Sequence, residues 1–341
     1  MKQKFKQITL SASLLACGLG ISGYAHAEAY AVSTNNIQNG LVSALVGGVP
    51  FPVSCLTCFS FGTPSSESST SATINGAGVA FSATGPNPNA PVSAVGGAAG
   101  RLDELGSPYY TLYGPGGLRP NYSWGDAIIN TEQTVTGTPI KARNAAETGL
   151  ITSGAGNADG TNKSSTSVSV NVVAGTNCDT TAACQIDFQG ESDPFMQVLL
   201  GASSGPGSIA RATLAFSITL TRVGDLLPTF AWAPNGDCVG GAGTCGGIIG
   251  GTEIRDDINL NLVREALLAG QNDTFSGPYG AGVYGKFEAK TKNLTSGNYT
   301  LSIFANEKTD AKLVVSEPAS LALLGMGLLG LGFGSRRRKP V

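Results

Sequence analysis

The sequence predicts an all-β fold, a jelly-roll-like β-sandwich between an N-terminal signal peptide and a C-terminal single transmembrane helix. Short segments in which apolar and polar residues alternate, as in strands with one buried face, recur between stretches rich in glycine, which supplies 48 of the 341 residues. Charged residues are only 13% of the chain, well below the usual share, a composition typical of exported β-proteins. The formal net charge is −2 and no basic patch precedes the C-terminal tail, so nucleic-acid binding is not expected.

Residues 1–27 have the organisation of a secretory signal peptide. Lys2, Lys4 and Lys6 form a basic start, a mainly apolar stretch follows, and Ala25-His26-Ala27 is an A-x-A cleavage site. We therefore expect Glu28 to be the first residue of the exported protein.

Removal of the signal peptide takes away His26, the only histidine of the chain. Without histidine, Ser-His-Asp and Cys-His catalysis and His-ligated metal sites are excluded. An alternative interpretation of the same region is that Leu14-Leu15-Ala16-Cys17 resembles a lipoprotein box, which would make Cys17 a lipidated N-terminus.

In the predicted exported domain, residues 28–312, the surest strand is Ala210–Val223, because its large apolar residues alternate with small polar ones. Ala29–Leu45 opens with alternation and is expected to be an edge strand. Residues 85–117, rich in Gly, Pro and Ala, predict a long loop with a single helical turn at Arg101–Leu105. The other expected strands are Ser71–Ile74, Gly78–Phe81, Ala127–Thr138, Thr166–Val173, Cys184–Phe188 and Phe195–Leu200.

The segment from Gly285 to Val315 gives the best indication of the architecture. Lys286–Thr291 alternates, Asn293–Gly297 predicts a turn in which the glycine admits a positive φ, and Asn298–Phe304 alternates again. Ala311–Val315 is a candidate for the last strand. Asp256–Ala269 fits an amphipathic helix, but Ile258–Leu262 also alternates, so helix and strand both stay open.

Six cysteines remain in the exported chain: Cys55, Cys58, Cys178, Cys184, Cys238 and Cys245. An even number in an exported protein favours disulfides. The cysteines lie in three close couples, so local pairing within each couple is the simplest scheme. The alternatives are a redox motif at Cys55-Leu56-Thr57-Cys58 and a zinc site. The first lacks a thioredoxin-like pattern and the second lacks further ligands.

Few residues suggest other chemistry, and we expect no catalytic residues and no resident metal or cofactor. Glu191 and Asp193 are the nearest pair of carboxylates for glycoside hydrolysis, although solvated loop carboxylates are the simpler explanation. Two oxygen-rich groups are candidates for Ca²⁺, although turns explain them too: Asp256, Asp257, Asn259 and Asn261, and Asn157, Asp159 and Asn162. Aromatic residues that could stack on sugars, or belong to the core, are Trp124, Trp232, Tyr109, Tyr110, Tyr113 and Tyr122.

Residues 313–341 combine three parts in a fixed order. A short polar motif, Ser316, Glu317 and Pro318, is followed by an uncharged apolar run at 319–334. A basic cluster of Arg336, Arg337, Arg338 and Lys339 ends the chain. The apolar run is at the short end of what spans a bilayer as a helix. The cations should stay in the cytoplasm, which places the residues upstream outside.

This order resembles the PEP-CTERM sorting signal of Gram-negative bacteria, with Ser316 in place of the first proline of the Pro-Glu-Pro-like motif. The resemblance implies an inner-membrane-anchored precursor that a membrane protease, exosortase, cuts near the motif. A plain C-terminal anchor is the alternative. In Phe230–Gly236, Asp257–Asn261 and the Leu-x-x-Gly-x-Tyr ending, the body resembles the EDSAxxA type of these proteins, whose naming motif is absent here. That type implies no catalytic residues.

Together these features predict an exported, non-enzymatic surface or extracellular-matrix protein associated with exopolysaccharide or biofilm. Its expected partners are the membrane, an exosortase-type protease and exopolysaccharide. The alternative is a secreted carbohydrate-binding or carbohydrate-active β-sandwich. A periplasmic redox protein, which would depend on Cys55 and Cys58, is a third class.

Overall fold

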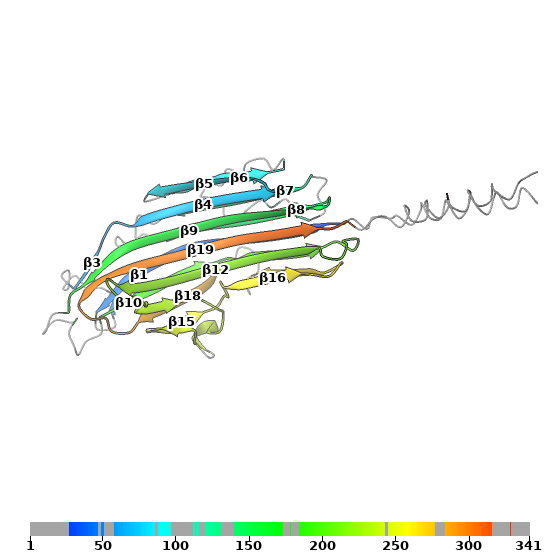
Figure 1. Cartoon of the computed structure of the whole chain (residues 1–341). Helices are drawn as coiled ribbons and strands as arrows, with labels where there is room; N and C mark the ends of the chain where they lie inside the picture. Colours follow the sequence, from blue (N-terminus) through cyan, green and yellow to red (C-terminus); the bar gives the residue numbers. More distant parts are fainter. Residues whose placement is uncertain are drawn as a thin grey trace, which may run out of the picture.

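The computed structural model describes residues 27–46, 49–50, 58–85, 88–96, 112, 114–115, 120–130, 140–172, 178, 184–242, 245–276, 284–315 and 328. These residues form two large β-sheets that lie one in front of the other (Figure 1). The predicted signal peptide and the helical turn at 101–105 lie outside the described residues.

The first sheet has ten strands, of which seven follow one another side by side. Their order is β15 (Gly251–Asp256), β18 (Gly285–Thr291), β10 (Cys184–Ser192), β1 (Ala29–Val46), β8 (Ile140–Leu150), β7 (Tyr122–Asn130) and β6 (Asn89–Val95). The others are β2 (Val49–Pro50) and β11 (Phe195–Leu200), which pair with β1, and β17 (Asn272–Ser276), which pairs with β11.

The second sheet has nine strands. Its order is β14 (Ile248–Ile249), β13 (Phe230–Trp232), β12 (Ile209–Arg222), β19 (Gly297–Leu313), β9 (Gly154–Val170), β4 (Ser65–Ile74) and β5 (Ala77–Gly85). In addition, β16 (Leu262–Ala266) pairs with β12 and β3 (Phe59–Phe61) with β9.

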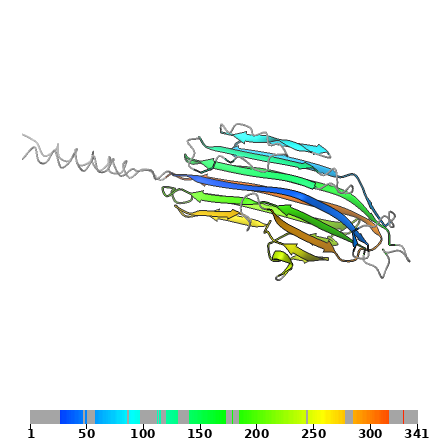
Figure 2. The same ribbon diagram turned by 180° about the vertical axis from the view of Figure 1, so that it is seen from behind.

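The structure confirms an all-β, two-sheet architecture and corrects several details. β1 lies in the middle of the first sheet, between β10 and β8, and not at an edge (Figure 2). The stretch predicted as a long loop contains β6, and the two expected segments after Gly297 form one continuous strand, β19. Asp256–Ala269 contains no helix: β15 ends at Asp256 and β16 begins at Leu262. Jelly rolls are built from two Greek keys. Strands β6, β7 and β8 instead follow one another as a meander within one sheet, which gives no support to the predicted jelly-roll topology.

One part of the space between the sheets is filled by large apolar side chains. The rings of Phe216 on β12 and Phe287 on β18 lie 5.4 Å apart, and those of Trp232 and Phe287 lie 5.9 Å apart. Phe188 and Phe230 stack at 5.0 Å. Because each pair joins the two sheets, burial of these rings holds the sheets face to face.

The other part, between β4 and β9 on one side and β6, β7 and β8 on the other, is filled by small and polar side chains. Hydrogen bonds cross between the sheets there. The Asn162 amide donates to the carbonyls of Ile128 (2.9 Å) and Arg143 (3.1 Å). The Thr148 and Thr309 hydroxyls lie 2.8 Å apart. Small side chains let the sheets approach closely, and the hydrogen bonds compensate for the burial of polar groups.

Gly160 on β9 lies in a region where the two sheets approach closely. A Cβ at this position would lie 2.4 Å from the carbonyl oxygen of Asp126 and 2.8 Å from that of Ala145, both in the opposite sheet. We expect Gly160→Ala to destabilise the fold by about 1–3 kcal/mol, because backbone must shift to admit the methyl group. At Gly156, on the same strand, the nearest atoms are 3.0 and 3.1 Å away, so Gly156→Ala should cost less. Urea unfolding of the two variants measures the difference, and equal losses would contradict the close approach at Gly160.

Glu307 on β19 is fully buried in the same polar region. Burial raises its pKa well above the usual range, and nearby Asp159 adds to this. The amides of Asn144 and Asn35 oppose the shift, but neither carboxylate oxygen has a hydrogen bond of good geometry among the described residues. The folded protein therefore favours the protonated form of Glu307.

This predicts a pH-dependent loss of stability. The pKa of Glu307 is raised on folding, so protonated Glu307 contributes to the free energy of unfolding. This contribution is fully present below the unfolded-state pKa and is lost as pH rises through the folded-state pKa. Each pH unit between the two values is worth up to about 1.4 kcal/mol. Glu307→Gln should therefore gain stability over the native chain as pH rises from about 4.5. Denaturant titrations across this range test it, with Asp310→Asn, whose side chain is 39% exposed on the same strand, as control.

Candidate functional site

The residues directly before the predicted sorting motif are fixed to one end of the sandwich. β19 ends at Leu313. The Val314 N–H then donates to the Ser208 hydroxyl (3.0 Å), and the Val314 carbonyl accepts the N–H of Gly205 (2.6 Å). The Val315 N–H donates to the Ser153 hydroxyl (3.1 Å). The tail therefore leaves the domain at a defined point, with no linker between the last strand and Ser316.

The start of the exported chain lies at the same end of the molecule. The Glu28 carbonyl accepts hydrogen bonds from the N–H of Gly201 (2.8 Å) and the hydroxyl of Ser204 (2.9 Å). Ser204 also forms a β-bridge with Val315. Figure 2 shows β1 beginning at the end where β19 finishes. One end of the sandwich, which we call the terminal pole, thus carries both the first and the last described residues of the domain.

The sorting residues Ser316, Glu317 and Pro318 and the basic cluster Arg336–Lys339 lie outside the described residues. So does the predicted membrane helix at 319–334, except Leu328, which is helical and exposed. Within the described ranges, no helix combines the length and the apolar character needed to cross a membrane. Three residues extend over at most about 11 Å, so a helix that starts at 319 would begin close to the terminal pole.

Two of the predicted disulfides are present, Cys178–Cys184 and Cys238–Cys245. Cys58 is buried and disulfide-bonded, and its predicted partner Cys55 lies outside the described residues. Cys178, Cys184 and Cys238 are buried. The predicted local pairing is therefore confirmed for Cys178–Cys184 and Cys238–Cys245.

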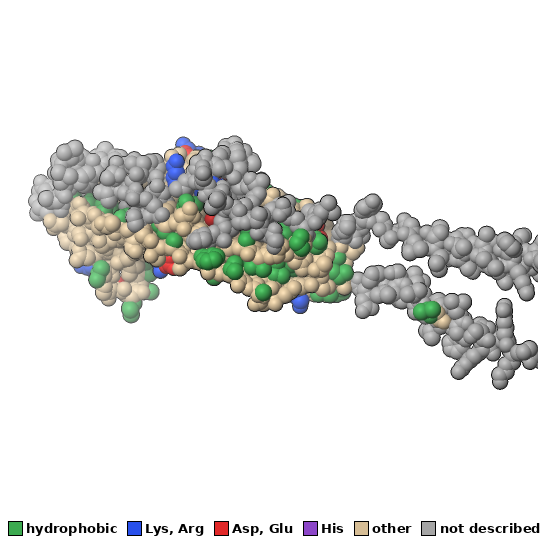
Figure 3. Space-filling model, turned by 90° about the horizontal axis from the view of Figure 1, so that it is seen from above, with side chains coloured by type: hydrophobic (Ala, Val, Ile, Leu, Met, Phe, Trp, Pro, Cys, Tyr) green, Lys and Arg blue, Asp and Glu red, His purple; other side chains and the backbone are tan. Residues whose placement is uncertain are grey.

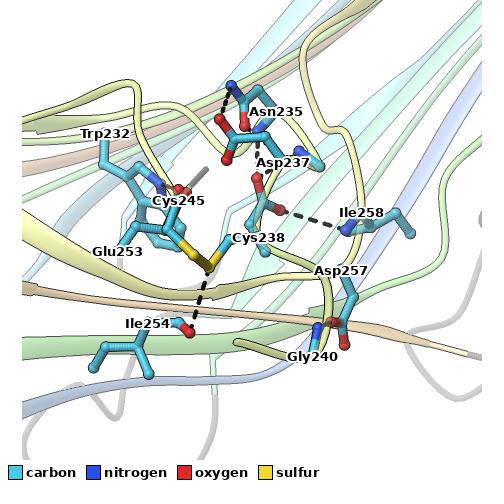
Figure 4. Close-up of a disulfide and its surroundings, with 12 residues drawn as sticks. Trp232, Asn235, Asp237, Cys238, Gly240, Cys245, Glu253, Ile254, Asp257 and Ile258 are labelled. Carbon is cyan, nitrogen blue, oxygen red and sulfur yellow. Dashed lines mark hydrogen bonds between the residues drawn. A yellow bond between two sulfur atoms is a disulfide. The ribbon is translucent and has the colours of Figure 1, made fainter. Parts of the chain in front are cut away.

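A cluster of three carboxylates lies beside the Cys238–Cys245 disulfide (Figure 4). Oxygens of Asp237, Glu253 and Asp256 lie within 4.8 Å of one another. Asp237 follows β13 of the second sheet, whereas Glu253 and Asp256 belong to β15 of the first sheet. Cys238 forms a β-bridge with Asp256. The cluster therefore lies where an edge of one sheet meets an edge of the other.

The turn after β13 positions these groups. Asp256 Oδ2 accepts the backbone N–H groups of Asn235 and Gly236, both at 2.5 Å. Gly236 has φ +77°, a conformation that favours glycine. The Asn235 amide also donates to Asp237 (3.1 Å). On the other side, the Trp232 indole N–H donates to Glu253 Oε1 at 2.6 Å.

Burial and mutual repulsion raise the pKa values in this cluster. The pKa of Glu253 is raised to about 7, chiefly by burial and further by Asp237 and Asp256, against the hydrogen bond from Trp232. The pKa of Asp256 is raised to about 6 by burial, against its backbone hydrogen bonds. The neighbouring cation Arg255 pairs with Asp257 at 2.6 Å, so it does not neutralise the cluster.

Glu147 on β8 shows how the same fold satisfies a buried carboxylate with donors alone. It accepts the hydroxyls of Tyr30 (3.0 Å) and Tyr122 (3.1 Å), the Trp124 indole N–H (2.6 Å) and the Gly114 N–H (3.0 Å). Burial and the charge of Glu147 raise the pKa of Tyr30. Each of the two tryptophans thus donates to a buried glutamate. The two carboxylate oxygens of Glu147 together accept four hydrogen bonds. Among the described residues, Oε2 of Glu253 accepts none.

Most of the other candidate residues lie apart from this carboxylate cluster. Glu191 contacts Asn39 (2.7 Å) and Lys286 (3.8 Å), an arrangement that fits a surface ion pair. Asn157, Asp159 and Asn162 lie within β9 and not in a loop. Of the group Asp256, Asp257, Asn259 and Asn261, only Asp256 joins the carboxylate cluster; Asp257 pairs with Arg255, and the two asparagines hold backbone.

Three of the aromatic residues proposed for sugar stacking lie in the described part of the chain, and all three are buried. Trp124, Trp232 and Tyr122 are 1%, 2% and 5% exposed, so they belong to the core. Tyr109, Tyr110 and Tyr113 lie outside the described residues. Sequence reasoning also missed Asp237 and Glu253. The bridge between Cys238 and Asp256 brings Asp237 to β15, and Glu253 lies three residues before Asp256 on β15, with a register shift between them.

Comparison with known proteins identifies the tail. Residues 314–339 match the family model described as the PEP-CTERM protein-sorting motif. The chain is thus a protein with a PEP-CTERM sorting signal, which indicates an exported precursor that an exosortase processes. No curated protein matches the chain. No solved structure matches it.

The contrast between the two glutamates predicts opposite responses to amide substitution. At pH 8 with a chelator present, Glu147→Gln should lower the free energy of unfolding by about 1–3 kcal/mol, because an amide nitrogen then faces hydrogen-bond donors. Glu253→Gln should instead stabilise the protein, since it removes a charge from the cluster and keeps an oxygen for Trp232. Urea unfolding compares the two, and a loss at Glu253 as large as that at Glu147 would contradict the repulsion at the cluster.

Proposed function

We propose that this chain is a non-enzymatic protein of the cell surface or extracellular matrix of a Gram-negative bacterium, associated with exopolysaccharide or biofilm. Its precursor is held in the inner membrane by a helix at 319–334, with Arg336–Lys339 on the cytoplasmic side. An exosortase-type protease cuts near Ser316–Pro318 and releases the β-sandwich from its anchor.

The observation that carries the proposal is the position of the sorting motif directly after the terminal pole. Because Val314 and Val315 are fixed to Ser208 and Ser153, Ser316–Pro318 are the first residues beyond the fixed end of the domain. A proline in the first turn of a helix needs no backbone donor and holds the preceding residue extended. Pro318 therefore suits a boundary between an extended cleavage segment and a membrane helix.

The geometry of the terminal pole also supports membrane-coupled export. A signal peptide that ends at Ala27 and an anchor that starts at 319 both connect to this pole. The sandwich can then fold with both termini attached to the membrane, without threading either terminus through the body. After both cuts, the released domain keeps its fold, because Glu28 and Val315 bond to residues of the body.

The low share of charged residues at the surface is consistent with an exported protein. The described part of the face in Figure 3 shows few Lys, Arg, Asp or Glu side chains, and charged residues are 13% of the chain. The alternative, a carbohydrate-binding module, is less supported, because Trp124, Trp232 and Tyr122 are buried.

Mass spectrometry of the surface-released protein tests the proposal. In cells with the protease, we expect a mature species that ends near Ser316–Pro318. In cells without it, the full tail should remain and the protein should fractionate with the membrane, since each Arg costs roughly 2.5–3.5 kcal/mol at the bilayer centre.

Two variants sharpen the test. Replacing Arg336, Arg337 and Arg338 together by Ala should reduce processing, because the tail is no longer stopped at the cytoplasmic face. Lys312→Ala, which removes an exposed cation of β19, should leave processing unchanged. A mature species that still carries Arg338 in protease-positive cells would leave only a plain membrane anchor.

A further inference from the structure

The oxygens of Asp237, Glu253 and Asp256 are spaced as ligands of one cation. Ca²⁺ binds oxygens at about 2.4 Å, so two ligands on opposite sides of the ion lie about 4.8 Å apart. The three carboxylates have oxygens within 4.8 Å of one another. No residue needs to move far for these oxygens to surround a single ion.

Protein donors hold one oxygen of each carboxylate and leave the other without a good partner. Trp232 donates to Glu253 Oε1, whereas Glu253 Oε2 is buried and receives no N–H or O–H donor of good geometry from the described residues. Within the same ranges, Asp237 Oδ1 is likewise buried without such a donor, while Oδ2 accepts from Asn235. Asp256 Oδ2 has two donors at 2.5 Å, and Oδ1 has only a 3.4 Å contact with the Ile258 N–H.

Glu253 is the independent indication that a ligand is needed. It is only 4% exposed, so water cannot readily solvate its second oxygen, and a buried polar atom without a partner is costly. Elsewhere in this fold a buried glutamate, Glu147, receives four donors. At Glu253 the groups gathered nearby are instead two further carboxylates. Of the basic residues on β15 and β18, Arg255 pairs with Asp257 and Lys286 with Glu191, and Lys290 interacts with Asp187 and Glu288.

The chemistry of the ligand set selects the ion. All three side chains offer carboxylate oxygens, which suit hard cations such as Ca²⁺. The sulfurs of Cys238 and Cys245 beside the cluster are joined in a disulfide, so they are not thiolate ligands for a soft metal. A divalent ion would balance most of the charge of three carboxylates.

We propose that Asp237, Glu253 and Asp256 form a Ca²⁺ site that joins the two sheets at one edge of the sandwich. Asp237 comes from the turn after β13 in the second sheet, and Glu253 and Asp256 come from β15 in the first. Ca²⁺ and the Cys238–Cys245 disulfide thus stabilise the same turn. Extracellular Ca²⁺ modules bind with dissociation constants of about 10⁻⁴–10⁻³ M, and we expect an affinity in this range.

Terbium luminescence tests the site in the full chain purified in detergent. Tb³⁺ replaces Ca²⁺ and emits when a nearby indole is excited, and Trp232 contacts Glu253 directly. We expect sensitised emission that Ca²⁺ displaces with a midpoint in the range given above. Ca²⁺ at 10 mM should also raise Tm by about 3–8 °C.

Matched variants decide whether this response comes from the cluster. Glu253→Gln and Asp237→Asn should each weaken Tb³⁺ binding at least 10-fold and abolish the Ca²⁺-dependent rise in Tm. Asp310→Asn, which removes an exposed carboxylate that pairs with Lys308, should bind as the native chain does. Asp237→Asn provides the readout if Glu253→Gln fails to fold, since Asp237 is only partly buried. Absence of sensitised emission, or equal emission from all of these proteins, would overturn the proposal.

Discussion

β19 is the strand on which the rest of the structure depends. It pairs with β9 from Gly297 to Leu313 and with β12 over nearly the same length. These long antiparallel ladders satisfy the backbone of three strands at once, and they set the axis of the second sheet. Because β19 is also the last described strand of the domain, the same ladders fix the point at the terminal pole where the sorting signal begins. The fold and the export function therefore share one element.

The two sheets are joined by two different kinds of packing. Where Phe216, Phe287 and Trp232 meet, burial of apolar surface provides the attraction. Between β9 and the strands β7 and β8, glycine and small hydroxyl and amide residues bring the backbones close, and hydrogen bonds replace the missing apolar volume. Such an interface depends on complementary hydrogen bonding, so it tolerates added volume poorly.

Buried carboxylates occur at several places in the domain, and their surroundings differ. Glu147 is surrounded by donors, Glu307 favours its protonated form, and the cluster at Asp237, Glu253 and Asp256 gathers acidic groups at an edge closed by a disulfide. The disulfides Cys178–Cys184 and Cys238–Cys245 constrain nearby loops in an oxidising compartment.

The sequence by itself determined the strand pattern, the disulfide couples and the sorting tail, because each depends on residues close together in the chain. Alternation from Ala210 to Val223 fixes one face of β12, and the order of motif, apolar run and arginines is linear. Strand pairing, which joins residues far apart in the chain, decided three other features. These are the central position of β1, the presence of β6 and the strand, rather than helix, within Asp256–Ala269. The carboxylate cluster also depended on it: Glu253 and Asp256 share β15, but Asp237 meets them only where the edges of two sheets come together. Small polar residues such as those of β9 look like solvent-exposed residues in the sequence, and only the packing of one sheet on the other shows that they are core.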